Sequence, residues 1–479
     1  MSKRAVFLLL ALAALILLGQ AVGPRNGPSA RPRADGEELL SLLRNNAFRA
    51  ADKLAAKKLA DPALDPRTRA VCGLAVLKAG RIEEAEAIFK KVIERSPDSP
   101  DAHLGLGRIA RIRNDEDAAI AHLRRAVPSV EFFEEALRQL WRAAWARGLV
   151  SDLAEIRSVA EERCRLASRP TPSWLENNLG QLRGLDGKRL YDLEGSFERL
   201  RVPLVTSSSH PRIRMASLKL NGRVDRLFHL DSALAEFMTI SPLLAEELGL
   251  AQTGSASSTG VGTAAIATRF AVLDKVELGR IAFRNVPVMV SDVRTLRGLK
   301  EGLIGTAFLK RFNVSIDVEA KVMDLFPLDR PDLLAAGIGR AAVAADVPLY
   351  CYDATAVEAT VEGAPPALYI LDSAAATNLV DRPFFGDHIK PKLDPARIVR
   401  AGIRGAGGPQ TVNQVEGLAV RLGPLLYDSL EFNEFPMEAL NAIPGRYAAG
   451  LLGNPLLWPY RVHMDFKNGR LILERRPGS

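Results

Sequence analysis

The sequence predicts a multidomain chain, in which an all-α helical repeat domain is followed by a mainly-β domain of two similar lobes. Amphipathic periodicity between residues 37 and 165 recurs every 34 residues, which is typical of stacked helix pairs. After residue 200, apolar and polar residues alternate in short runs bounded by turn residues, as in antiparallel strands. In this second part Asp-Ser-Ala occurs twice, at 231–233 and 372–374, each time after an apolar run.

The composition is ordinary for a globular protein, with 479 residues, 47% hydrophobic, 25% charged and a net charge of +8. The basic residues are not clustered with interleaved aromatics, so nucleic-acid binding is not expected. The three cysteines lie far apart, and the six histidines form no HExxH or Cys/His pattern. We therefore expect no metal site and no cofactor.

The first residues have the pattern of a targeting segment. Lys3 and Arg4 precede an uninterrupted apolar run at 5–18, followed by small residues. The uncharged stretch is also long enough to span a bilayer, so residues 1–24 are interpreted as either a signal peptide or an uncleaved anchor. Either alternative predicts export, which in a bacterium means the periplasm or the outer face of the inner membrane. Residues 25–36 then form a linker.

Two repeats of the helical part align at a spacing of 34, beginning at Cys72 and at Leu106. Small residues recur where paired helices cross, and large ones recur where the groove between pairs is filled. The matched positions are Gly73 and Gly107, Ala85 and Ala119, and Phe89 and Leu123. This pattern resembles the tetratricopeptide repeat family, and the resemblance implies a superhelix whose concave face binds a protein partner or a substrate.

The β part contains the same order of features twice. In each half a hairpin leads into Asp-Ser-Ala, followed by a Gly-rich segment, a strand pair, an apolar-apolar-Gly strand and a final hairpin. The apolar-apolar-Gly strands end at Gly305 and Gly453, and the Gly-rich segments lie near Thr253 and Ile403. Both halves resemble the retropepsin-like aspartic proteases in their bacterial branch, and two such units in one chain resemble the two lobes of pepsin-like enzymes.

This resemblance implies the roles of several residues. Asp231 and Asp372 would form a catalytic pair that shares and activates a water molecule, one carboxyl being ionised and the other protonated. Ser232 and Ser373 match the position whose hydroxyl bonds across the lobe interface, and the Gly-rich segments match the flaps that cover the substrate. The remaining motif-loop residues are Ala233 and Ala374, with Gly305 and Gly453 on the strands that cross the loops.

The sequence departs from the family motif at its third position, where both halves have Ala in place of Gly. A positive φ at that position would strain an alanine. We therefore keep two interpretations: an exported aspartic endopeptidase that recruits partners or substrates through its repeats, and a catalytically inactive peptide-binding protein with the same folds. The expected boundaries are 37–165 for the repeats, 166–200 for a linker, 201–330 for the first lobe, 331–345 for a second linker and 346–479 for the second lobe.

Overall fold

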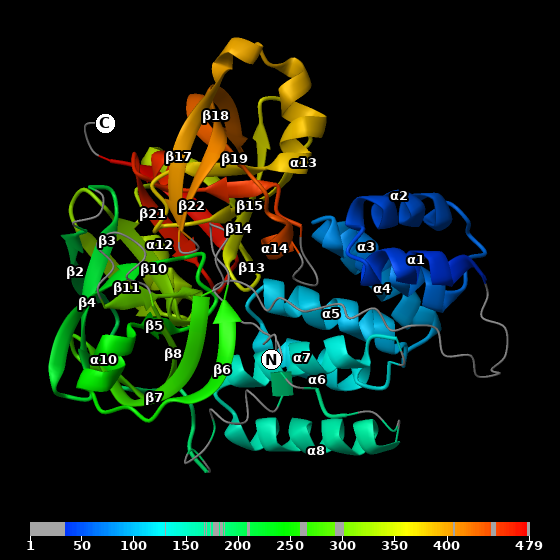
Figure 1. The fold of residues 1–479 in the computed structure, drawn as a ribbon, viewed down its shortest axis with the longest axis horizontal. Helices are drawn as coiled ribbons and strands as arrows, with labels where there is room; N and C mark the ends of the chain where they lie inside the picture. Colours follow the sequence, from blue (N-terminus) through cyan, green and yellow to red (C-terminus); the bar gives the residue numbers. More distant parts are fainter. Residues whose placement is uncertain are drawn as a thin grey trace, which may run out of the picture.

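The computed structural model describes residues 34–476, and the expected signal or anchor at 1–24 lies outside them. The helical repeat lies beside a larger β domain in which the two lobes are stacked (Figure 1). No helix in the described part of the chain is both long and apolar enough to cross a bilayer. Within 34–476 the residues not described are 130, 167, 169, 173, 176–181, 183–184, 186, 208–210, 259–265, 293–300, 406–407 and 442–446.

The helical part consists of consecutive antiparallel helices whose starts are encoded locally. Pro66 and Pro100, 34 residues apart, each occupy the first turn of a helix, and the preceding Asp65 and Ser99 cap it by accepting from a backbone N–H. The helices are α1 (Ala34–Arg44), α2 (Phe48–Leu59), α3 (Pro66–Lys78), α4 (Ile82–Arg95), α5 (Pro100–Ile112), α6 (Glu116–Ala126), α7 (Phe133–Arg147) and α8 (Val150–Leu166).

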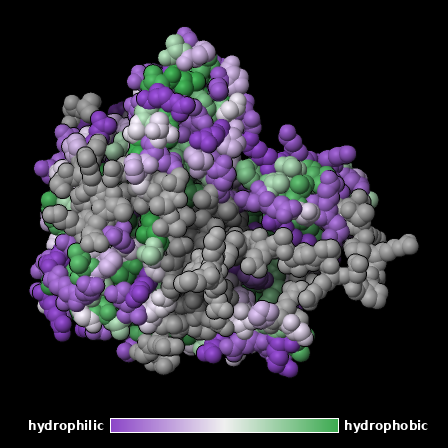
Figure 2. Space-filling view, in the orientation of Figure 1, coloured by the Kyte–Doolittle hydropathy of each residue, from purple (hydrophilic) through white to green (hydrophobic). Residues whose placement is uncertain are grey.

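The predicted repeat pairing is confirmed by the packing between these helices. A Cβ on Gly73 would lie 2.6 Å from the ring of Phe89, and a Cβ on Gly107 would lie 2.6 Å from Cγ of Leu123. Only glycine therefore allows α3 and α5 to approach the large side chains of α4 and α6. Apolar side chains fill these contacts, and hydrophilic side chains make up most of the described surface in the view of Figure 2.

The first lobe is built from short strands and two short helices. Its Asp-Ser-Ala motif follows β4, and the strand that crosses the motif is β9. The elements are β1 (Asp192–Glu194), β2 (Leu200–Thr206), β3 (Arg214–Leu220), β4 (Val224–Leu230), β5 (Met238–Ile240), α10 (Pro242–Glu247), β6 (Thr253–Ser258), β7 (Ile266–Leu278), β8 (Ile281–Ser291), β9 (Gly302–Ile304), α11 (Thr306–Leu309), β10 (Phe312–Asp317) and β11 (Val322–Pro327).

The second lobe repeats this order, with its motif after β15 and β20 as the crossing strand. Its strands are β12 (Val343–Pro348), β13 (Tyr350–Cys351), β14 (Thr355–Val361), β15 (Ala367–Leu371), β16 (Asn378–Asp381), β17 (Ile398–Gly405), β18 (Gly408–Leu422), β19 (Leu425–Phe435), β20 (Gly450–Leu452), β21 (Tyr460–Asp465) and β22 (Arg470–Arg475). Its helical segments are α13 (Arg382–Phe384), η3 (Phe385–Ile389), η4 (Lys390–Lys392), η5 (Pro395–Arg397), α14 (Glu438–Asn441) and α15 (Asn454–Leu457).

The segments expected as linkers contain regular structure. The segment at 331–345 holds α12 (Pro331–Ala336), η2 (Arg340–Ala342) and the start of β12, which pairs with β22. The segment at 166–200 holds β1, which pairs antiparallel with β8 of the first lobe. Both segments therefore contribute to the β domain.

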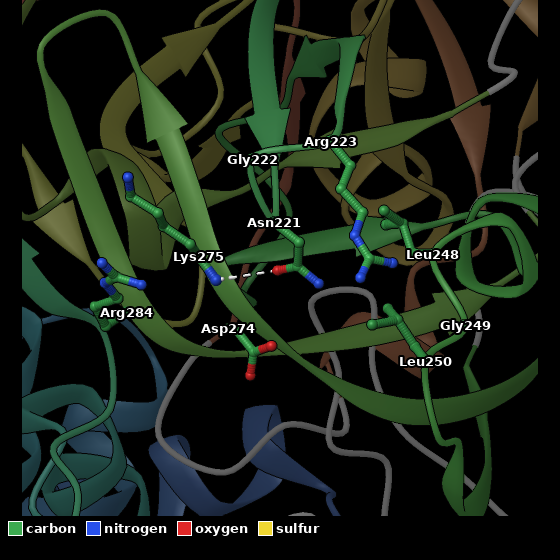
Figure 3. Close-up of a pocket in the computed structure, with 9 residues that line it drawn as sticks. All are labelled: Asn221, Gly222, Arg223, Leu248, Gly249, Leu250, Asp274, Lys275 and Arg284. Atoms are coloured by element: carbon green, nitrogen blue, oxygen red, sulfur yellow. Dashed lines mark hydrogen bonds between the residues drawn. The ribbon is translucent and has the colours of Figure 1, made fainter.

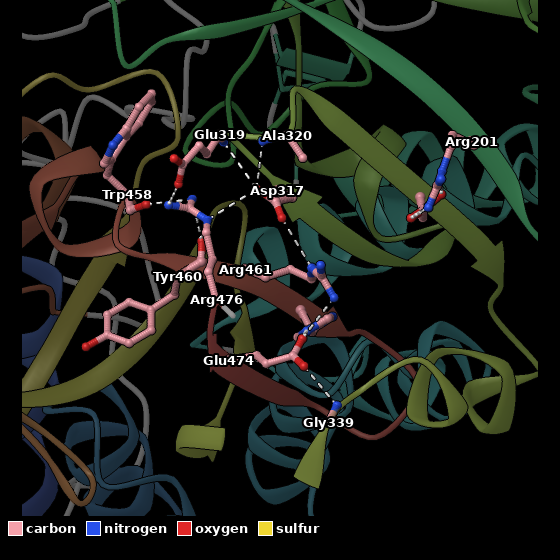
Figure 4. Close-up of polar contacts among 12 residues, drawn as sticks. Arg201, Asp317, Glu319, Ala320, Gly339, Trp458, Tyr460, Arg461, Glu474 and Arg476 are labelled. Carbon is pink, nitrogen blue, oxygen red and sulfur yellow. Dashed lines mark hydrogen bonds and ion pairs between the residues drawn. The ribbon is translucent and has the colours of Figure 1, made fainter. Parts of the chain in front are cut away.

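The two lobes share one continuous sheet. In the described part of the chain, strands of both lobes follow the order β12-β22-β21-β10-β11-β2, and the lobes meet where β10 pairs antiparallel with β21. Buried acids pair with partly exposed arginines at this junction. Asp317 at the end of β10 lies 3.4 Å from Arg461 and 3.3 Å from Arg476, and Arg461 also contacts Glu474 (Figure 4). This sheet fixes the lobes relative to each other and hence the two motif loops.

Candidate active site

Each aspartate lies at the end of a buried strand and is held there by the crossing strand. β4 runs parallel to β9, and the backbone N–H of Asp231 donates to the carbonyl of Ile304 (2.9 Å). In the second lobe β15 runs parallel to β20, and the N–H of Asp372 donates to the carbonyl of Leu452 (3.0 Å). The duplicated sequence thus gives duplicated geometry at both motif loops.

The serine hydroxyls join the two loops by four reciprocal hydrogen bonds. Oγ of Ser232 donates to the carbonyl of Leu371 (2.8 Å) and accepts from the N–H of Ser373 (3.1 Å). Oγ of Ser373 donates to the carbonyl of Leu230 (2.8 Å) and accepts from the N–H of Ser232 (3.1 Å). The structure therefore brings together the two serines that the sequence predicts as bonding across the lobe interface, in a nearly twofold-symmetric arrangement.

The alanines of the motif take part through their backbones. The N–H of Ala233 donates to Oδ1 of Asp231 (2.9 Å), and the N–H of Ala374 donates to Oδ1 of Asp372 (2.8 Å). Neither alanine is among the described non-glycine residues with positive φ. The Gly-to-Ala change therefore does not strain the backbone of either loop, and each carboxyl keeps the backbone donor that orients it.

Asp231 is buried, Asp372 is half-buried, and their carboxyl groups interact electrostatically. Burial raises the pKa of Asp231 to about 6, although the N–H groups of Ala233 and Leu234 favour its ionised form. Burial and then the nearby charge of Asp231 raise the pKa of Asp372 well above its ordinary value. Two carboxyls whose pKa values are raised in this way can hold one proton between them.

The sequence analysis missed polar residues that support the motif serines. Oγ1 of Thr306 donates to the carbonyl of Ser232 (2.7 Å), and Nδ2 of Asn454 donates to the carbonyl of Ser373 (2.8 Å). Both directly follow the glycine of an apolar-apolar-Gly strand, so a polar residue at that position in both halves is the signal that points to them. Thr355 also bonds the Ser232 carbonyl, through its N–H and its Oγ1 (both 3.1 Å), and nothing local in the sequence marks it.

The motif glycines leave no room for a side chain. A Cβ on Gly305 would lie 2.1 Å from the carbonyl oxygen of Glu236, and a Cβ on Gly453 would lie 2.4 Å from that of Thr377. These carbonyls belong to the two motif loops. Glycine is therefore required for β9 and β20 to cross the loops closely.

We expect Gly453→Ala to destabilise the second lobe by about 1–3 kcal/mol, because the added methyl forces backbone apart in a packed region. Gly386→Ala in the same lobe is the matched control, since a Cβ there meets nothing within 4 Å. Urea unfolding followed by circular dichroism measures the difference. Equal unfolding midpoints for the two variants would contradict this explanation of the motif glycine.

Each lobe also contains a hairpin at the predicted flap position. In the first lobe β6 pairs with β7, and in the second β17 pairs with β18 up to Gly405 opposite Gly408. The tips at 259–265 and 406–407 lie outside the described residues. The flap role of the Gly-rich segments stays a prediction.

Among the residues that the structure describes, no cluster of three or more His, Cys, Asp or Glu side chains is arranged to hold a metal ion. A pocket of about 620 Å³ opens on the first lobe between the β3–β4 turn, the end of α10 and the β7–β8 hairpin, where Asn221 accepts from the N–H of Lys275 (Figure 3). Its lining residues include no member of either motif loop.

Two family models match the chain, one in its helical part and one in its β part. Residues 73–144 match the tetratricopeptide repeat model and residues 216–308 match the aspartyl protease model. Similar solved structures include conglutin gamma from lupine seeds (11% identity, 59% of this chain and 96% of that chain, TM-score 0.35). Basic 7S globulin from soybean is another (10% identity, 58% of this chain and 95% of that chain, TM-score 0.36). A search of curated proteins finds no match. The chain thus contains a tetratricopeptide repeat followed by an aspartyl protease domain, in the order that its sequence predicts.

Proposed function

We propose that the protein is an aspartic endopeptidase that hydrolyses peptide bonds with Asp231, Asp372 and a water molecule held between them. The observation that carries the proposal is the pair of electrostatically interacting carboxyls on loops joined by the reciprocal serine bonds. Such loops hold two carboxyls rigidly enough to share one proton. A rigid, water-poor site is where positioned acids and bases act most effectively.

The proposed mechanism divides the work between the two acids. Ionised Asp231, whose charge raises the pKa of Asp372, takes a proton from the water while the water oxygen attacks the scissile carbonyl carbon. Protonated Asp372 donates a hydrogen bond to the carbonyl oxygen and transfers its proton as the tetrahedral intermediate forms. The proton held by Asp231 then passes to the leaving amine, the C–N bond breaks, and the diol oxygen returns its proton to the pair.

The proposal also includes export and partner binding. Lys3, Arg4 and the apolar run after them support export, to the periplasm or the outer face of the inner membrane in a bacterium. The helical repeat would recruit a substrate or a protein partner, as repeats of this architecture present extended binding surfaces.

A mixed peptide library tests the proposal directly. The full chain is incubated with the library, and products are identified by mass spectrometry with and without a statine-containing peptide, which mimics the tetrahedral intermediate. We expect internal cleavage that the statine peptide blocks. A folded chain that binds library peptides and leaves them intact would instead establish the peptide-binding interpretation.

The pH profile provides a separate prediction. Below about pH 6 both carboxyls are protonated and no base is present, so kcat/KM is expected to rise as pH increases through about 6 and Asp231 ionises. Burial and the charge of Asp231 raise the pKa of Asp372, so Asp372 is expected to keep its proton after Asp231 has ionised. The assay uses a peptide without titratable side chains. An optimum near pH 4 with loss of activity by pH 6 would contradict the assigned pKa values.

A further inference from the structure

The ends of α5 and α7 face the protease domain in Figure 1, and α7 contacts both of its lobes. On the first lobe, Nη2 of Arg311 donates to the carbonyl of Ala146 at the end of α7 (2.7 Å). On the second lobe, Arg142 of α7 forms an ion pair with Asp353. Helix α7 thus bridges the two lobes whose relative position sets the spacing of the catalytic pair.

Asp353 is one of the residues through which the repeat contacts the second lobe. Besides Arg142, it contacts Nη2 of Arg111 on α5 (3.4 Å). The side chains of Arg142 and Asp353 are only 14% and 13% exposed. Because so little water surrounds the pair, loss of Arg142 leaves the Asp353 charge less well compensated, with Arg111 still in contact, and Asp353 and the backbone next to it are then expected to shift.

A short path leads from Asp353 to the catalytic loop. Asp353 lies two residues before Thr355, whose N–H and Oγ1 both bond the carbonyl of Ser232. Ser232 directly follows Asp231 and bonds the loop of Asp372. A displacement of Asp353 is therefore transmitted through two residues of backbone to the peptide next to the catalytic carboxyl.

The same helix supports the other end of this loop. Nε1 of Trp145 donates to the hydroxyl of Tyr191 (2.8 Å), and the Tyr191 ring stacks on Phe237 with centroids 4.8 Å apart. Burial raises the pKa of Glu236, the neighbour of Phe237, to about 7. The charge of Arg142 lowers this pKa and the charge of Asp353 raises it, so both charges act on the loop. Residues 231–237 are thus connected to α7 at both ends.

We propose that Arg142 is a positioning residue for the catalytic pair: by holding Asp353, it fixes Thr355 and the Ser232 carbonyl and so the geometry of the Asp231 loop. The inference rests on the proposed peptidase function. It makes the helical repeat a support of the active site in addition to a recruiting surface. Placement errors of about 1 Å far from the reacting atoms are enough to reduce catalysis substantially.

Hydrogen–deuterium exchange of the full chain tests the positioning without requiring activity. In Arg142→Met we expect peptides covering 231–237 and 352–358 to exchange about tenfold faster than in the wild type. Arg124→Met is the matched control, because Arg124 forms exposed ion pairs with Asp152 and Glu155 inside the repeat. Unchanged exchange in both peptides would overturn the proposal, and so would equal acceleration in the control.

Kinetics separate positioning from simple support of the fold. We expect Arg142→Met to lower kcat about tenfold with little change in KM, and Arg142→Lys to retain most of the wild-type kcat. Asp353→Asn should lower kcat by the same factor, and combining it with Arg142→Met should cause no further loss. Additive losses, or no rescue by lysine, would overturn the proposal. If Arg142→Met does not fold, Asp353→Asn takes its place in the exchange experiment. A wild type that cleaves nothing refutes the peptidase function, whereas the exchange result still decides whether α7 holds the loop.

Discussion

Asp231→Asn and Asp372→Asn are each expected to lower kcat/KM by about 10³-fold, because each removes a proton donor or acceptor that the other aspartate cannot replace. The amide keeps the shape of the carboxyl, and its oxygen can still accept from the N–H groups that orient Asp231 and Asp372. Steady-state cleavage of a peptide selected from the library measures the loss.

The same substitutions are expected to leave the fold intact and to stabilise it at neutral pH. The pKa of Asp231 is raised to about 6 in the folded chain, whereas in the unfolded chain this carboxyl ionises near pH 4. Its ionisation therefore favours the unfolded chain as pH rises above about 4, and this destabilisation is complete above about pH 6. Asparagine has no charge to bury, which removes this contribution. A higher melting temperature at pH 7 and no change at pH 3 would agree with this sign.

Asp225→Asn serves as control for both measurements, because Asp225 lies on the same strand β4 and is exposed. It should alter neither activity nor melting temperature. Full activity in one of the two active-site variants would contradict a shared pair and would leave a single working lobe.

Ser232→Ala is the second change with a large expected effect. Ser232 is fully buried, and its hydroxyl serves a carbonyl of the other lobe and an N–H of the other motif loop. Alanine leaves the N–H of Ser373 without this acceptor and weakens the bonding of the Leu371 carbonyl, which has a longer contact to Thr355 (3.4 Å). Two disturbed buried groups cost about 2–4 kcal/mol in the free energy of unfolding.

Ser373→Ala should cost a similar amount, because its bonds to Leu230 and Ser232 mirror those of Ser232. Ser291→Ala is the matched control: Ser291 is equally buried, but its hydroxyl bonds Thr268 within the first lobe. Urea unfolding of the three variants and their peptidase activity are compared. We expect only the substitutions of the motif serines to lower activity. If they lower the free energy of unfolding no more than Ser291→Ala does, the lobes do not depend on these hydroxyls.

Features encoded by nearby residues could be predicted from the sequence. The 34-residue spacing predicted the helix pairs because Gly73 and Phe89 meet within one repeat unit. The doubled Asp-Ser-Ala and apolar-apolar-Gly segments predicted both motif loops because they recur in the same order in the two halves, although each crossing strand is distant in sequence from its loop.

The remaining contacts connect distant parts of the chain, and no local pattern specifies them. Arg142 and Asp353 are 211 residues apart, and the sequence presents them as an ordinary helix surface charge and an ordinary turn acid. Thr355 resembles any threonine at the start of a strand until the fold places it against Ser232. The pairing of β10 with β21 depends on the docking of two complete lobes, which alternation of apolar residues does not encode.

The shared sheet has a consequence for the ancestry of the chain. The sheet passes from the second half to the first where β21 pairs with β10, and these two strands occupy corresponding places in the two lobes. One half alone would expose this strand as an open edge, ready to pair with an identical copy. Such self-association would face two copies of one Asp-Ser-Ala loop across a true dyad. The present chain then has the form of a fused homodimer, in which covalent linkage released each half to diverge, so that the first could acquire its own contacts with α7.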